Sequence, residues 1–174
     1  MRSSLFESPP PPPTMTTADS AIGQRLRAVD WVALSAEVDA QGYAVISQLL
    51  TGGTCAAMSA RYDEDALFRS RVVMARHGYG LGEYRYFAYP LPDPVVELRT
   101  QVYAQLVPLA NRWNKAMGID VSYPDSHAEF ITRCHAAGQV RPTPLLLRYG
   151  VDDYNCLHQD LYGEHVFPLQ LAVL

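Results

Sequence analysis

Several kinds of residue and segment are scarce in this sequence of 174 residues. Its three cysteines, Cys55, Cys134 and Cys156, are too few and too scattered for a disulfide framework, and an odd number favours a reducing compartment. No uninterrupted apolar run is long enough to span a bilayer, and the N-terminus lacks the apolar segment of a secretory signal. We therefore expect neither secretion nor membrane insertion, and predict a cytoplasmic location.

Basic charge is also scarce. The 14 lysine and arginine residues are outnumbered by 18 aspartate and glutamate residues, which gives a formal net charge of −4. This balance excludes the overall basic surface that drives non-specific binding to phosphate backbones, so any contact with nucleic acid has to be local. With 48% hydrophobic residues, the chain is long enough for one domain with a sizeable core.

The N-terminal segment has the composition of a tail. A proline run from Pro9 to Pro13 is followed by threonine, serine and aspartate, a composition that favours extended polyproline II and cannot bury apolar surface. We predict a disordered tail over residues 1–20 and a folded domain over residues 21–174. A proline run can also be a ligand of SH3 or WW domains, but without a known partner a plain linker is preferred.

Capping residues and apolar periodicity predict four helices. They lie between Asp30 and Gly42, from Thr51 to about Tyr62, from Asp93 to Gly118, and from Ser126 to Gly138. Asp30 is a good N-cap, and Gly42 stands just past the end of the first helix. Asp93 is the expected cap of the third helix. Pro108 falls inside that helix and predicts a kink or two shorter helices, and Ser126 opens a capping-box pattern.

Extended structure is predicted mainly in the second half of the chain. Three short strands are expected in "TPLLLRYG" (143–150), "YNCLHQD" (154–160) and "FPLQLAVL" (167–174). "GYAVISQLL" (42–50) is a further predicted strand, and residues 68–92 mix β-type residues, arginines, tyrosines and glycines in the manner of irregular strands and a loop. Helices followed by strands are the order of an α+β fold.

His158 and Asp160 form an H-x-D pair within the second of these strands. Residues two apart in an extended strand point to the same face, so both side chains can reach one metal ion while Gln159 faces away. With a second histidine they would complete the 2-His-1-carboxylate triad of non-haem iron oxygenases. Alone, H-x-D is also a common polar pair at a strand end. A zinc site that includes Cys156 is a further alternative, but it lacks a fourth ligand.

The residues around this pair resemble a known family. The segment "RYGVDDYNCLHQD" (148–160) is similar to the 2-oxoglutarate- and Fe(II)-dependent oxygenases. It shares the Y-G-V turn, a second tyrosine and H-x-D with their prolyl-hydroxylase branch, and R-Y followed by H-Q-D with their alkylated-nucleic-acid repair branch. Residues 157–174 and 76–92 also resemble an uncharacterised bacterial group of these oxygenases that is assigned to damaged DNA or another nucleic acid. The resemblance covers most of residues 25–174.

The resemblance implies a fold, two cofactor molecules and three site residues. The fold is a double-stranded β-helix, or jelly-roll, whose first strands are the three predicted above, with the N-terminal helices packed on them. His158 and Asp160 would hold Fe(II), and Tyr149, nine positions before His158, would bind the cosubstrate 2-oxoglutarate. The implied reaction uses O₂ to convert 2-oxoglutarate to succinate while a prime substrate is oxidised, and the protein contributes orientation and a dry pocket.

The sequence departs from this pattern at its C-terminal end. The distal histidine and the basic residue that pairs with 2-oxoglutarate lie on late strands of the jelly-roll, which would follow Leu174. His165 is the only histidine after Asp160, and we expect it at the surface or behind the ligands. The upstream histidines are His77, His127 and His135, and they would require a different topology. We expect a C-terminally truncated oxygenase domain with an incomplete jelly-roll, which binds iron weakly and is inactive or nearly so.

The prime substrate stays open between a nucleic acid and a protein. The segment from Arg69 to Tyr89 can be a recognition lid, with aromatic rings for bases and arginines for phosphates, or it can be a half-buried strand pair. The acidic composition favours a protein substrate, as in prolyl hydroxylases. A rival of another class is a non-catalytic jelly-roll binding module that has lost its iron site.

Overall fold

The computed structural model describes residues 20–160 and 163–174. Almost all of the predicted tail therefore lies outside the described residues. Ser20, which we assigned to the tail, belongs instead to the fold, because its hydroxyl caps a first helix that we did not predict and accepts a hydrogen bond of 2.9 Å from the Gly23 amide. No helix within the described ranges is long and apolar enough to cross a membrane.

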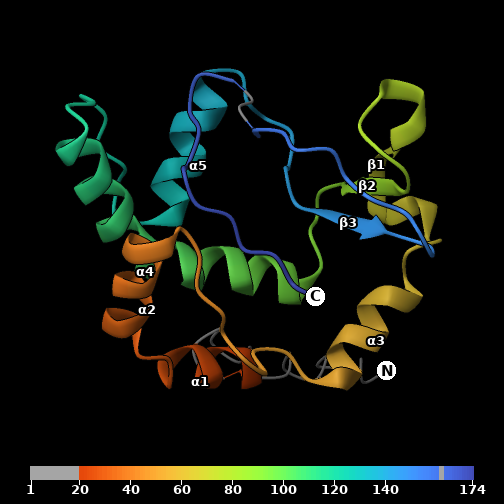
Figure 1. Ribbon diagram of the computed structural model, residues 1–174, viewed down its shortest axis with the longest axis horizontal. Helices are drawn as coiled ribbons and strands as arrows, with labels where there is room; N and C mark the ends of the chain where they lie inside the picture. Colours follow the sequence, from red (N-terminus) through yellow and green to blue (C-terminus); the bar gives the residue numbers. More distant parts are fainter. Residues whose placement is uncertain (1–19, 161–162) are drawn as a thin grey trace, which may run out of the picture.

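The described residues form an α+β fold, as predicted (Figure 1). The helices are α1 (Ala21–Arg27), α2 (Trp31–Gln41), α3 (Gly52–Ala60), α4 (Asp93–Ala116) and α5 (His127–Ala136), and the strands are β1 (Phe68–Val73), β2 (Glu83–Phe87) and β3 (Leu145–Arg148). Short 3₁₀ turns cover Asp65–Leu67 and Met74–His77. In Figure 1 the sheet lies to the right of α2 and α5, and α4 runs below.

Helix boundaries follow the capping signals closely. The Asp30 carboxylate accepts hydrogen bonds from the first turn of α2, and Gly42 ends that helix in the left-handed conformation with φ of 84°. The Thr51 hydroxyl caps α3, and the Ser126 hydroxyl accepts a hydrogen bond of 3.2 Å from the Glu129 amide at the start of α5. These caps satisfy backbone donors that a helix cannot satisfy itself, which explains why they can be located from the sequence.

Helix α4 is a single helix that runs through Pro108. Its N-cap is Pro92 rather than Asp93, so our expected cap is one residue late, and Asp93 contributes its negative charge to the first turn instead. The first and last parts of the helix run in different directions in Figure 1. This bend matches the predicted kink, because a proline inside a helix removes one backbone hydrogen bond and clashes with the preceding turn.

The predicted strand over residues 42–50 is wrong. The structure has no strand there, and Leu49 is buried in a core cluster with Ile22 and Leu26 of α1 and with Leu98 and Val102 of α4. The apolar residues that suggested a strand therefore serve helix packing. A strand also needs a neighbour to satisfy its backbone groups, and no strand lies beside this segment among the described residues.

The sheet has three antiparallel strands in the order β1-β2-β3. Register places Glu83 opposite Arg148, and Tyr84 opposite Leu147. The first of the three predicted C-terminal strands is confirmed as β3, but residues 154–160 form only an isolated bridge between Asn155 and Gly80, and residues 167–174 form no strand. Within the described residues the sheet is thus smaller than the jelly-roll that we expected.

Aromatic packing explains where the last segment goes. Phe167 lies in a cluster with Tyr103 of α4, Phe130 of α5 and Tyr123, at ring-centroid distances of 4.9, 5.9 and 5.1 Å. The Tyr123 hydroxyl also donates a hydrogen bond of 2.6 Å to the Val166 carbonyl. The segment therefore packs on the helices instead of extending the sheet, since burial of large rings outweighs the weak β preference of a few residues.

His127 provides a test of this packing. Its ring lies 5.5 Å from that of Tyr103, and burial lowers the pKa of His127 to about 4, with a further contribution from the charge of Arg99. The unfolded chain binds a proton on His127 below its usual pKa near 6.5, whereas the folded chain does so only near pH 4. We therefore expect the free energy of unfolding to decrease as the pH falls from 6.5 to 4. The variant His127→Gln should not show this part of the decrease.

The matched control is His135→Gln, which removes an exposed histidine of the same helix. Melting temperatures are measured from pH 7.5 to pH 4.5 for all three proteins. Wild type and His127→Gln should diverge as the pH falls, with the variant losing less. Parallel curves for these two proteins would contradict burial of a neutral His127.

Candidate functional site

The loop between Met74 and Glu83 is the platform on which the predicted site is built. Gly80 has φ of +119°, and a Cβ atom added to it would lie 2.1 Å from the Tyr154 carbonyl oxygen. This close approach allows two backbone hydrogen bonds of 2.8 Å each. The Leu81 amide donates to the Tyr154 carbonyl, and the Cys156 amide donates to the Tyr79 carbonyl. Any side chain at Gly80 would separate the two segments.

Gly82 makes room for Tyr149 in the same way. Its φ is +106°, and an added Cβ would lie 2.8 Å from Cδ1 of the tyrosine ring. Tyr149 directly follows β3, and 44% of its surface is exposed. The glycine run, which lies in the segment that we read as a candidate recognition lid, is thus a packing surface. Tyr149 lies against one end of it, and the segment leading to His158 lies against its middle.

His158 and Asp160 lie side by side, as the H-x-D spacing predicted. The distance between His158 Nε2 and Asp160 Oδ1 is 3.4 Å, and the two side chains are 47% and 35% exposed. They come together although residues 156–160 are not in a regular strand. An isolated bridge between Asn155 and Gly80 lies just before them.

A backbone contact fixes the tautomer of His158. Its Nδ1 lies 2.8 Å from the Cys156 carbonyl oxygen, which can only accept a hydrogen bond. In the neutral ring the proton is therefore on Nδ1, and the lone pair of Nε2 faces the Asp160 carboxylate. Two acceptor atoms at this distance repel each other unless a proton or a cation lies between them. A protonated imidazole makes this contact an ion pair, and a bound cation would remove the same repulsion.

Asp160 has a second contact, which the sequence did not predict. The Gln170 amide nitrogen donates a hydrogen bond of 2.6 Å to Asp160 Oδ2, which leaves Oδ1 toward His158. Burial raises the pKa of the Tyr84 hydroxyl, and the neighbouring Tyr79 and Asp160 raise it further. The carboxylate of Asp160 thus lies close enough to β2 for its charge to act there.

A third ligand is not gathered at this pair. Within residues 20–160 and 163–174, no group of three or more histidine, cysteine, aspartate or glutamate side chains could hold a metal ion. The other histidines have different surroundings. His77 stacks on Tyr79, and His127 contacts Tyr103. His135 is exposed on α5, and Gln139 binds the backbone of His165. Cys156 is exposed, and no zinc site is assembled around it among the described residues.

The sheet carries an aromatic face beside this pair. Tyr84 and Tyr86 alternate along β2 with the buried residues Glu83, Arg85 and Phe87. The Arg69 guanidinium lies 4.3 Å from the centre of the Tyr86 ring. Residues 68–73 and 83–87 therefore form a strand pair, and one of its faces carries two tyrosines and an arginine.

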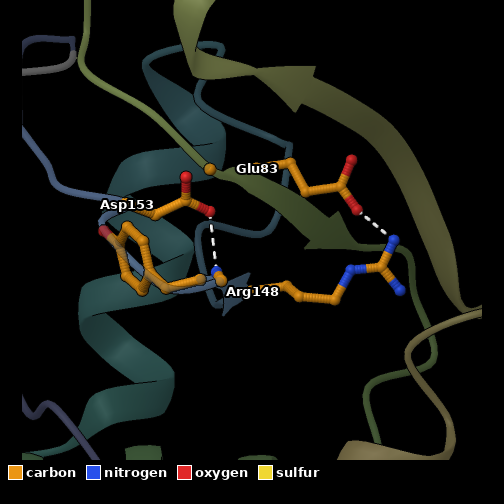
Figure 2. A pocket seen from close by; sticks show the side chains of 6 residues that line it. Glu83, Arg148 and Asp153 are labelled. Carbon is orange, nitrogen blue, oxygen red and sulfur yellow. Dashed lines mark hydrogen bonds and ion pairs between the residues drawn. The ribbon is translucent and has the colours of Figure 1, made fainter.

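The opposite face of the sheet is an ion-pair network. Glu83, only 12% exposed at its side chain, forms an ion pair with Arg148 (Figure 2). It also binds Arg71, and Arg148 contacts Asp63 at 3.0 Å. Burial alone would raise the pKa of Glu83, but the two arginines outweigh it and hold the pKa below its usual range. Because these charges neutralise one another, this network holds β2 and β3 together rather than offering a site for an anion.

An open pocket of about 500 Å³ adjoins Tyr149. It is lined by Gly82, Glu83, Arg148, Tyr149, Gly150 and Asp153. The Asp153 carboxylate accepts a hydrogen bond of 2.7 Å from the Gly150 amide, which shapes the turn after β3 (Figure 2). Neither His158 nor Asp160 lines this pocket, so the three predicted site residues share the glycine loop as a support without meeting in one cavity.

The sequence missed Gly80, Gly82 and Gln170 as residues that shape the site. The glycines gave a signal, since Gly78, Gly80 and Gly82 alternate within five residues. In a sequence, however, glycines that allow close packing cannot be told apart from glycines of a flexible loop. Gln170 gave none, because it lies ten positions after Asp160 and no local pattern links the two side chains.

Alanine substitution separates close approach from backbone strain alone. Gly78 also has a positive φ, of +71°, but no atom lies within 4 Å of the position of its Cβ. We expect Gly78→Ala to cost about 1–2 kcal/mol of unfolding free energy through strain. Gly80→Ala should cost roughly 2–4 kcal/mol, because it also displaces residues 154–156. Urea unfolding measures both, and equal losses would contradict a packed platform.

Comparisons with known proteins point to one family. A family described as an oxygenase catalysing oxidative methylation of damaged DNA matches residues 82–174, more than half of the chain. Two uncharacterized proteins of Mycobacterium tuberculosis, from strains CDC 1551 and H37Rv, are each 42% identical to this chain over 113 residues, which are 62% of its length. The chain spans about half the length of these relatives, 48% of each. No solved structure matches it. The match over residues 82–174, which include Tyr149, His158 and Asp160, shows that the chain belongs to this family of oxygenases.

Proposed function

We propose that this chain carries two iron ligands, His158 and Asp160, of a 2-oxoglutarate-dependent dioxygenase that acts on damaged nucleic acid. The observation that supports it most is the pair itself, with His158 Nε2 and Asp160 Oδ1 3.4 Å apart and Nδ1 of His158 bound to the Cys156 carbonyl. We further propose that β2 and β3 belong to a jelly-roll sheet of the kind that the family resemblance implies.

The geometry of the pair fits a metal ion. Two ligand atoms that each lie about 2.1 Å from one metal, roughly 90–110° apart, are separated by about 3.0–3.4 Å. The Nε2–Oδ1 distance of 3.4 Å falls at the upper end of this range. Imidazole and carboxylate are also two of the ligand types of the facial triad for Fe(II). The described residues supply two ligands, so we expect weak binding and little or no turnover by the 174-residue chain.

Each residue of the site has a defined task in this proposal. Fe(II) and 2-oxoglutarate, when bound, supply the oxidising chemistry for hydroxylation or oxidative demethylation with O₂. His158 offers Nε2 because the Cys156 carbonyl holds the proton on Nδ1. Asp160 offers Oδ1. Tyr149 hydrogen-bonds the cosubstrate, a role that rests on the resemblance and on its position at the glycine loop.

The aromatic face supports a nucleic acid as the prime substrate. Tyr84 and Tyr86 lie on one face of β2, the charge of Asp160 acts on the Tyr84 hydroxyl, and Arg69 stacks on Tyr86. Aromatic rings stack on bases and arginines contact phosphates, so a local contact is feasible despite the net charge of −4. The family description names damaged DNA. A protein substrate is the alternative that the acidic composition favours.

Metal binding tests the ligand assignment directly. Mn(II) replaces Fe(II) because it is stable in air, and electron paramagnetic resonance of free Mn(II) measures even weak binding. We expect His158→Ala and Asp160→Ala each to weaken binding tenfold or more, about 1.4 kcal/mol, because each removes one of two ligands. His135→Ala, on exposed surface of α5, is the control. Equal binding by all four proteins would rule out the pair as a metal site.

Cosubstrate binding tests Tyr149 separately. A chelating cosubstrate that also contacts Tyr149 should tighten Mn(II) binding by the wild-type chain. We expect Tyr149→Phe to keep the affinity for Mn(II) alone but to reduce the effect of 2-oxoglutarate by about tenfold, because one hydrogen bond is lost. Tyr154→Phe, also on the segment beside the loop, is the control. An unchanged effect of 2-oxoglutarate in Tyr149→Phe would remove Tyr149 from the site.

A further inference from the structure

We infer that Gln170 is a positioning residue for Asp160. This inference rests on the proposed function, because its consequence is measured as metal affinity. Gln170 lies ten positions after Asp160, and its side-chain amide donates a hydrogen bond of 2.6 Å to Oδ2. The other oxygen, Oδ1, is the one that faces His158 Nε2 at 3.4 Å. Gln170 thus selects which carboxylate oxygen is offered to a metal.

The position of Gln170 is determined by contacts with the helices. The Gln139 side chain makes two hydrogen bonds with the backbone of His165, one to its carbonyl (3.0 Å) and one from its amide (2.8 Å). Phe167 then packs between Tyr103 and Tyr123. Three positions further on, Gln170 meets Asp160. The segment from His165 to Gln170 is therefore held at two points before it contacts Asp160.

This path gives Asp160 an orientation that its own segment does not provide. Residues 156–160 have no regular secondary structure, and the Asp160 side chain is 35% exposed. An exposed carboxylate on an irregular segment rotates freely unless it is hydrogen-bonded, and free rotation opposes metal binding through lost entropy. Hydrogen bonds from outer residues to metal-bound carboxylates typically change metal affinity by 10–100-fold.

The electrostatic arrangement agrees with this role. The Gln170 amide carries no net charge, so it orients the carboxylate without neutralising it. A lysine or arginine at this place would compete with a metal cation for the same negative charge. His158 is held in a comparable way by the Cys156 carbonyl, at 2.8 Å. Each of the two proposed ligands therefore has one atom fixed by the protein and one atom available.

Gln170→Met is the sharpest variant, because methionine keeps the length of the side chain but cannot donate a hydrogen bond. Gln170→Ala removes the side chain as well. The matched control is Gln41→Met: Gln41 also donates to an exposed carboxylate, Glu37, at 2.8 Å, but on α2. Mn(II) affinity is measured by electron paramagnetic resonance for the full 174-residue chain, and the melting temperature is measured in parallel.

We expect both Gln170 variants to bind Mn(II) about 10–100-fold more weakly than wild type. Their melting temperatures should stay close to those of wild type and Gln41→Met, because the hydrogen bond is exposed. Wild-type affinity in Gln170→Met would overturn the inference. A fall in melting temperature that accounts for the lost affinity would also overturn it, because it would show a merely structural role.

The outcome for wild type separates this inference from the proposed function. If wild type binds Mn(II) no better than His158→Ala and Asp160→Ala do, the metal site itself is refuted and the role of Gln170 falls with it. If wild type binds Mn(II) through these ligands and Gln170→Met binds equally well, only the role of Gln170 is refuted.

Discussion

The close approach of two backbone segments at Gly80 is the constraint on which the site depends. The Tyr154 carbonyl occupies the space that a Cβ atom would fill, and the bonds from Leu81 to Tyr154 and from Cys156 to Tyr79 follow from that approach. The Cys156 carbonyl in turn fixes the proton of His158. Because Gly80 has no side chain, these three contacts can form, and the last of them determines which imidazole nitrogen of His158 is available.

The helices take part in the site through the last described segment. Phe167 contacts α4 and α5, and Gln170 reaches back to Asp160 from that anchor. The loop at Gly80 therefore supports the segment that carries His158, and Gln170 links Asp160 to the segment packed on the helices. On the other face of the sheet, Glu83 of β2 and Arg148 of β3 form an ion pair that links the two strands. The proposed two-ligand site combines these separately stabilised parts.

The sequence predicted the helices well because their ends are chemical signals, as at Asp30 and Ser126, and because Pro108 has a known effect on a helix. It predicted the proximity of His158 and Asp160 for a similar reason, since their spacing is local. Three expected strands failed, over residues 42–50, 154–160 and 167–174, because apolar and β-branched residues indicate burial and not the presence of a neighbouring strand. The roles of Gly80 and Gln170 depend on distant contacts that no local pattern encodes.

Mapping bound Mn(II) on the isotope-labelled protein by nuclear magnetic resonance tests the central claim most directly. Unpaired electrons broaden the signals of nearby nuclei, so the affected residues locate the ion without any substitution. We expect the signals of His158, Asp160 and Gln170 to disappear first, followed by those of Tyr84 and the loop at Gly80. Broadening that centres on another carboxylate cluster, or that spreads evenly over exposed acidic residues, would contradict a metal site at His158 and Asp160.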